Sequence, residues 1–113
     1  MKDFVTLRIY FEHGQKAKGH SFWKKLHAPA FDREILKRAK AFDLYQVLNF
    51  NVSKGYLNGA AIQWGHAESL HFRHPQVMEI IDREEKIMAF VKQEESLLKE
   101  TKLLLVKNEM LVL

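Results

Sequence analysis

The sequence predicts a single α+β domain of ferredoxin-like topology, in which the elements follow the order βαββαβ. The prediction rests on a pattern that occurs in both halves of the sequence: an apolar strand, an amphipathic helix and a second strand. A loop rich in glycine, residues 55–66, separates the halves. Two helices suffice to cover one face of an antiparallel four-stranded sheet. The 113 residues suit one domain, spanning residues 1–113, with a core of its own.

The first half predicts a strand, a helix and a second strand. Residues 4–11 alternate as a strand does, with Phe4 and Tyr10 on the face opposite to the main apolar set. A loop and a short helical turn are expected before Pro29, and a second strand over residues 45–53. The main apolar set of the first strand is Val5, Leu7, Ile9 and Phe11. The residues at helical spacing, which predict a helix of about thirteen residues, are Phe31, Ile35, Ala39 and Phe42.

The second half repeats this order. Residues 70–74 are expected to be extended and Pro75 to interrupt them, before a third strand over residues 76–81. Asp82 and Glu85 resemble a capping box and predict that the second helix begins there. Residues 103–106 predict a fourth strand, and residues 110–113 allow a short fifth. The apolar stripe of the second helix comprises Ile87, Phe90, Val91, Leu97 and Leu98.

One face of this sheet is expected to lack a cover. The two helices can pack on only one side, yet the first, third and fourth strands carry apolar residues on both faces. A bare apolar face of that size marks an interaction surface. The sequence therefore predicts a homo-oligomer that associates through its sheets or their edges.

Composition and charge limit the kinds of partner and the location that the sequence predicts. Lys and Arg outnumber Asp and Glu by 18 to 14, and the pI is about 9.4, which mildly favours anionic partners. The basic residues are scattered rather than gathered into the stripe that nucleic acid requires, so no nucleic-acid partner is expected. Cysteine is absent, and no apolar run reaches the length of a membrane span. We expect a cytoplasmic protein without direct membrane insertion.

Three segments carry a resemblance to a known family. These are Leu7–Tyr10, Gly55–Gly59 and Pro75–Ile87, whose last block begins Pro-Gln-Val-Met-Glu. Together they resemble domain-of-unknown-function family 190, which is grouped with the PII-like signalling proteins. The likeness spans nearly the whole chain and is weakest between Gly14 and Asp43.

The resemblance implies a homotrimer with a loop over residues 55–66 equivalent to the T-loop of PII proteins. It also implies a small anionic effector, such as a nucleotide or an inorganic anion, bound in clefts between subunits. The partner implied is a protein target such as a fluoride-exporting membrane channel. Two segments depart from the family pattern, Lys18–Trp23 and Asp43–Leu44, and the nucleotide-contacting motifs of PII proteins are not found by position. ATP binding is therefore not carried over, and no bound cofactor is expected.

The candidate ligand-binding residues come from the loop and from nearby cations. Glycines permit close backbone approach, and exposed aromatic rings can stack on a ligand or a partner. Arg suits bidentate recognition of phosphate or carboxylate. For Arg8 a plainer interpretation is a cross-strand ion pair with Glu79 that fixes the register. The candidates are Arg8, Lys54, Gly55, Tyr56, Gly59, Trp64, Arg73 and Lys86.

Metal binding and catalysis have weaker support. His66, His71 and His74 are candidate metal ligands, but their spacing does not suit a tight local site. The serines lie in no nucleophile-elbow pattern, so no enzyme is expected.

Two other functions stay open. One is an RNA-binding module of RRM-like topology, although strand 76–81 lacks the aromatic residues that such a module stacks on bases. The other is a CutA-like metal-binding trimer.

Overall fold

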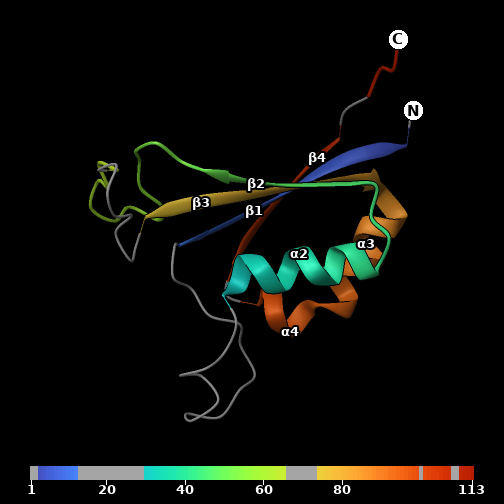
Figure 1. The fold of residues 1–113 in the computed structure, drawn as a ribbon, viewed down its shortest axis with the longest axis horizontal. Coiled ribbons are helices and arrows are strands. Elements are labelled where there is room, and N and C mark those ends of the chain that lie inside the picture. Colours follow the sequence, from blue (N-terminus) through green and yellow to red (C-terminus); the bar gives the residue numbers. More distant parts are fainter. Residues whose placement is uncertain (1–2, 13–29, 66–73, 100, 108–109) are drawn as a thin grey trace.

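The computed structural model describes residues 3–12, 30–65, 74–99, 101–107 and 110–113. It confirms the ferredoxin-like order, with four antiparallel strands in the spatial order β2-β3-β1-β4 (Figure 1). The described elements are β1 (Phe4–Glu12), α2 (Phe31–Ala41), β2 (Gln46–Asn51), β3 (Pro75–Arg83), α3 (Glu84–Gln93), α4 (Glu95–Leu98) and β4 (Lys102–Lys107).

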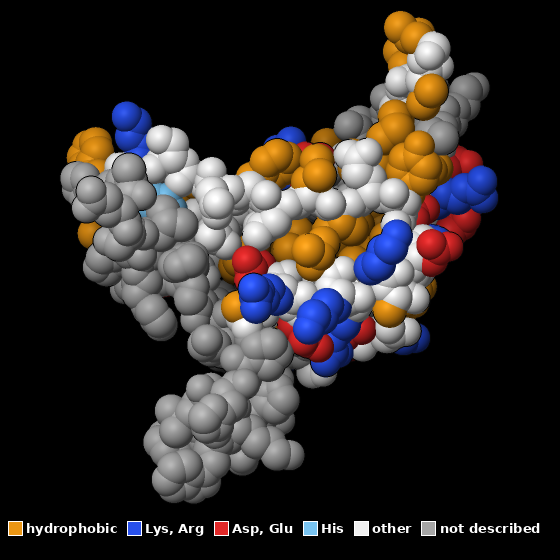
Figure 2. All heavy atoms as spheres, viewed as in Figure 1, with side chains coloured by type: hydrophobic (Ala, Val, Ile, Leu, Met, Phe, Trp, Pro, Cys, Tyr) orange, Lys and Arg blue, Asp and Glu red, His pale blue; other side chains and the backbone are white. Residues whose placement is uncertain are grey.

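The helices lie together on one face of the sheet and enclose the core (Figure 1). Ile9 of β1 and Ile80 of β3 are fully buried beneath Phe31 of α2 and Phe90 of α3. Phe11 packs on Phe31 with ring centroids 4.9 Å apart. The predicted apolar stripes of both helices therefore face the sheet, and charged side chains gather over the outer surface of the helix layer (Figure 2).

The strand register divides the other face of the sheet into three rows. We call this face, opposite to the helices, the open face. Each row takes one residue from each strand in the order β2, β3, β1, β4. The rows are Gln46, Ile81, Thr6 and Val106; Leu48, Glu79, Arg8 and Leu104; and Phe50, Val77, Tyr10 and Lys102.

Helix α2 ends in a Schellman motif built on an aspartate. Asp43 has a φ of 61°, and its amide donates to the Lys40 carbonyl at 3.0 Å while the Leu44 amide donates to the Ala39 carbonyl at 3.1 Å. Glycine is the usual residue at this left-handed position. Lys86 Nζ donates to the Asp43 carbonyl oxygen at 2.6 Å, which joins this helix end to α3.

The expected capping box at Asp82 is wrong. Helix α3 has Arg83 as its N-cap, without a side-chain cap. Strand β3 continues to Arg83 because Phe4 pairs with it, so Asp82 is a strand residue whose side chain is buried. Its carboxylate instead accepts the amide of Tyr45 at 2.8 Å and that of Arg83 at 2.6 Å. Asp82 thus ties the start of β2 to the end of β3.

Two further expectations at strand ends are corrected. The third strand begins at Pro75, opposite Glu12, and not at residue 76 as expected. Proline is tolerated at that place because the first residue of a strand can lack an amide donor. Residues 110–113 lie outside the sheet rather than in a fifth strand, and Leu111, Val112 and Leu113 are exposed. The predicted elements within residues 13–29 and 70–73 lie outside the described residues.

Candidate functional site

The loop between β2 and β3 contains a small hairpin of its own, residues 55–65, which we call the loop hairpin. It lies beyond the ends of the two strands (Figure 1). Gly55 and Gln63 exchange two backbone hydrogen bonds, of 3.0 Å and 2.8 Å. At the tip the Ala60 amide donates to the Leu57 carbonyl at 3.0 Å. Asn58 and Gly59 between them have φ of 54° and 69°, the signature of a type I′ turn.

The loop hairpin presents one strongly exposed face. Its exposed residues include Tyr56, Ile62 and Trp64, and Lys54 next to its base is exposed as well. Tyr56, Ile62 and Trp64 are 58%, 48% and 62% exposed. The bridge between Gly55 and Gln63 has Tyr56 and Ile62 next to it toward the tip, and Lys54 and Trp64 next to it toward the base. Three large apolar side chains and one cation therefore share a surface.

The base of the loop hairpin is held by three close approaches of the chain. Gly65 has a φ of 65°, and a Cβ there would lie 1.9 Å from the Ser53 carbonyl oxygen and 3.1 Å from His74 Cε1. The His74 ring is fully buried, and its Nε2 donates to the Val52 carbonyl oxygen. Among the described residues its Nδ1 has no hydrogen-bond partner. Together these contacts fix where the hairpin leaves the sheet.

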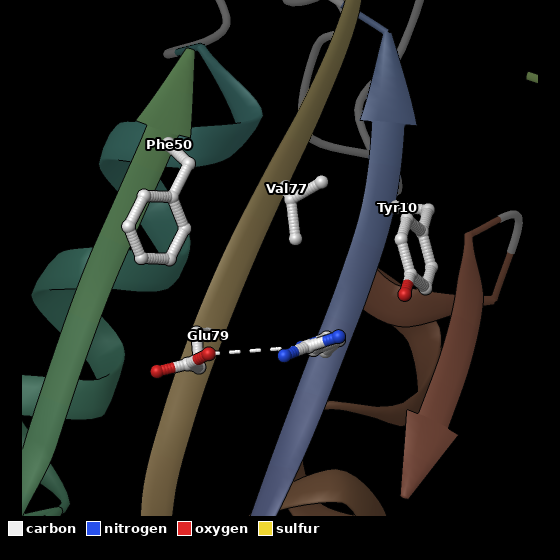
Figure 3. Close-up of a pocket in the computed structure, with 5 residues that line it drawn as sticks. Tyr10, Phe50, Val77 and Glu79 are labelled. Atoms are coloured by element: carbon white, nitrogen blue, oxygen red, sulfur yellow. Dashed lines mark ion pairs between the residues drawn. The ribbon is translucent and has the colours of Figure 1, made fainter. Parts of the chain in front are cut away.

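The open face holds an ion pair and a hollow. Arg8 Nε lies 3.6 Å from Glu79 Oε2, and the two side chains are 46% and 18% exposed. Next to this pair is a shallow hollow of about 290 Å³, lined by the pair and by Tyr10, Phe50 and Val77. Figure 3 shows the rings of Tyr10 and Phe50 on either side of Val77, with the ion pair below them.

The structure does not bring the predicted cations together. The cross-strand interpretation of Arg8 is confirmed by its pairing with Glu79. Lys86 instead lies on α3, where it contacts the Asp82 carboxylate at 3.7 Å as well as the Asp43 carbonyl. Lys54 is exposed beside the loop hairpin. Arg73 lies outside the described residues.

The predicted metal ligands are only partly visible. His66 and His71 lie outside the described residues, and His74 is turned into the base of the loop hairpin. Within the described ranges no three His, Asp or Glu side chains are grouped so as to hold a metal ion.

Two features escaped prediction from the sequence. The Asn58–Gly59 dipeptide is a strong hairpin signal, but the residues around it were treated as one long loop. The second is a half-buried ion pair, in which Arg38 Nη1 of α2 lies 2.5 Å from Oε1 of Glu94 at the end of α3; the two side chains are 46% and 5% exposed. Hydrogen bonds to Glu34 and then to Glu94 raise the pKa of Arg38. Nothing in the local pattern of Glu94 marks it as a buried carboxylate.

Comparisons with known proteins agree with this architecture. The crystal structure of a protein from Thermus thermophilus, described as a PII-like signaling protein, superimposes with a TM-score of 0.52 at 10% identity, over 90% of this chain and 81% of that one. A hydantoinase/carbamoylase-family amidase from Burkholderia phymatum gives a TM-score of only 0.33 at 15% identity, over 95% of this chain and 28% of the other. This similarity is too low to support an inference about fold or function.

Two sequence comparisons and the length of the helices give further findings. No curated protein matches the chain. Among the helices described here, none is long and apolar enough to cross a membrane. The model of family DUF190, described as uncharacterized ACR, matches residues 4–110. Because that match covers nearly the whole sequence, the protein belongs to the DUF190 family.

Proposed function

We propose that this protein is a non-enzymatic regulatory binding protein, which contacts a target protein through the loop hairpin and works as a homotrimer. The observation that carries the proposal is the exposure of Tyr56, Ile62 and Trp64 on one face of an ordered hairpin. Aromatic side chains are enriched at the centres of protein interfaces. A hairpin already closed by its turn loses little conformational entropy when it binds.

The chemistry of this surface indicates its target. Three apolar side chains need an apolar surface to cover them, and Lys54 beside Trp64 favours an acidic group at its rim. The likeness to a PII-like signaling protein supports a regulatory role, and a fluoride-exporting channel is one such target implied by the family resemblance. A small anionic effector, bound near Lys54 between subunits, would couple reciprocally to the target.

Target binding is tested by the variant Tyr56→Ser/Trp64→Ser. The tagged wild-type protein is used to isolate a partner from soluble and membrane extracts of its own cells, and affinity for the purified partner is then measured. We expect the variant to bind at least about 30-fold more weakly, the loss typical of removing aromatic hot spots. The control is Leu36→Ser/Met88→Ser, which removes similarly exposed apolar side chains, 45% and 49%, from the helices. Equal affinity of both variants would contradict the role of the hairpin.

The effector is tested separately by thermal unfolding in the presence of adenine nucleotides, phosphate, sulfate and fluoride. A ligand that binds only the folded protein raises its unfolding temperature in a concentration-dependent manner. We expect at least one of these anions to do so at millimolar concentration and Lys54→Ala to weaken the effect. If none stabilises the protein, the effector part of the proposal fails, while target binding by the loop hairpin is judged by its own experiment.

A further inference from the structure

The centre of the open face carries two opposite charges side by side. Arg8 and Glu79 occupy the middle row, between Leu48 on β2 and Leu104 on β4. The row on one side of them, from Gln46 to Val106, bears no charge. In the row on the other side the only charge is Lys102, at the edge. An adjacent cation and anion are therefore enclosed by largely apolar surface, of which Leu48, Phe50 and Leu104 are 45%, 44% and 46% exposed.

The ion pair within one chain does not use all of the N–H donors of the Arg8 guanidinium. Its Nε–Oε2 separation of 3.6 Å is longer than the 2.7–2.9 Å of a charge-assisted hydrogen bond. A guanidinium has five N–H donors, and the Arg8 side chain is 46% exposed. Arg8 can thus reach a second carboxylate above the sheet without giving up Glu79.

We propose that the open faces of separate copies pack on one another, with Arg8 of one subunit bonded to Glu79 of the partner subunit. The inference rests on the homo-oligomer of the proposed function and names the side chains that select its interface. A face with one cation beside one anion can give each of these charges an opposite charge on a neighbouring copy. In a closed ring each Arg8 meets the next Glu79, so that positive and negative charges alternate around the axis.

Other occupants fit this face less well. A nucleic acid would bring phosphates over the Glu79 carboxylate, and so would an anionic membrane surface. A second copy supplies an arginine for that carboxylate and apolar side chains for the rim. The hollow between Tyr10 and Phe50 would be covered in the same contact. Exclusion of water by the rim strengthens the cross-subunit pairs because the local dielectric constant falls.

The same geometry makes the contact selective. A partner without matching charges would leave Arg8 or Glu79 desolvated and unpaired, which is far costlier than leaving an apolar contact unmade. The apolar rim therefore contributes attraction, and the two central charges decide which surface and which orientation are accepted.

Charge reversal with mixing tests the proposal. The variant Arg8→Glu has two anions at the centre of its face, and Glu79→Arg has two cations there. Each variant alone should self-associate at least about tenfold more weakly than wild type, because like charges meet across the interface. A mixture of the two should associate more strongly than either variant alone, because two of the three contacts in a mixed trimer pair opposite charges, and the double variant Arg8→Glu/Glu79→Arg should assemble like wild type. Sedimentation velocity and native mass spectrometry measure the species formed, and circular dichroism establishes that each variant is folded.

Matched controls reverse the same charges on the helix side. Lys37→Glu and Glu85→Arg, both at exposed positions, should associate like wild type alone and in mixture. The mixing result separates the proposal from a pair that acts within one chain only, since an internal pair is not restored by mixing. A wild type that assembles while the single variants assemble equally well, or while their mixture associates no better than either variant alone, overturns the inference but leaves the oligomer standing. A wild type that is monomeric at micromolar concentration removes both.

Discussion

Gly65 passes so close to Ser53 that a Cβ on Gly65 would lie 1.9 Å from the Ser53 carbonyl oxygen. This is backbone against backbone, so no side chain can move aside. We predict that Gly65→Ala destabilises the protein by about 2 kcal/mol or more, because strain at the positive φ adds to the overlap. Urea unfolding measures the loss. Amide hydrogen exchange at Gly55 and Gln63 should show that the loop hairpin opens.

Gly59→Ala is the matched control for this prediction. Gly59 also has a positive φ, 69°, but a Cβ there would meet nothing within 4 Å. The cost should be only about 1 kcal/mol, the usual penalty for alanine in the left-handed region. Equal losses at the two glycines would show that conformation alone, rather than the contact with Ser53, makes Gly65 necessary.

His74→Ala should destabilise the protein by about 2–4 kcal/mol. The substitution leaves a cavity where the buried ring packs and removes the donor to the Val52 carbonyl. His74→Phe separates the two effects, because its somewhat larger ring leaves no cavity while the hydrogen bond is lost. We expect Phe to recover part of the stability in thermal unfolding. Full recovery would mean that the bond to Val52 contributes nothing.

Asp43→Gly should stabilise the protein by about 0.5–1 kcal/mol. Asp43 occupies a left-handed position at the end of α2, and glycine adopts that conformation without steric cost. The bond from Lys86 uses the backbone carbonyl and survives the substitution. The urea midpoint should rise for Asp43→Gly and not for Asp43→Ala. A lower midpoint with glycine would imply a contribution from the Asp43 carboxylate that the backbone geometry does not explain.

Arg38→Ala should cost about 1–3 kcal/mol, because it leaves the Glu94 carboxylate buried without its cation. The magnitude is reduced by the exposure of Arg38, 46%. Glu34→Ala removes the other, more exposed pair and should cost only about 0.5 kcal/mol. The pKa of Arg38 is raised, so its contribution is complete below the pKa of arginine in the unfolded chain and is lost only at strongly alkaline pH. The effect of Arg38→Ala should therefore be the same at pH 6 and pH 9 in urea unfolding; a pH-dependent effect would contradict this assignment.

How far the sequence predicts this molecule depends on whether a signal is local. The alternation of residues 4–11 predicted the open face and the pairing of Arg8 with Glu79, since both follow from the period of a strand. Asp82 was misread because its spacing to Glu85 imitates a cap, whereas pairing with Val5, far away in sequence, keeps it in β3. A local pattern cannot show which of two compatible structures a distant strand selects.

The same distinction between local and distant interactions applies to the predicted site residues. Tyr56 and Trp64 were singled out as loop aromatics that could stack on a ligand or a partner, and the structure leaves the two side chains 58% and 62% exposed. Lys86 was assigned to a ligand cleft, yet its charge is used within the subunit by Asp82 and the Asp43 carbonyl. The residue type and approximate position of Lys86 could not reveal the Asp43 carbonyl as its partner, because the two residues meet only when α3 packs against the end of α2.

The bridge between Gly55 and Gln63 limits how the first arm of the loop hairpin can change in length. One residue inserted between Gly55 and Tyr56 would turn Tyr56 inward and a neighbour outward, since successive side chains of an extended chain point to opposite sides. Two residues inserted there return Tyr56 to its outward position, so functional variants of this arm should lengthen in steps of two.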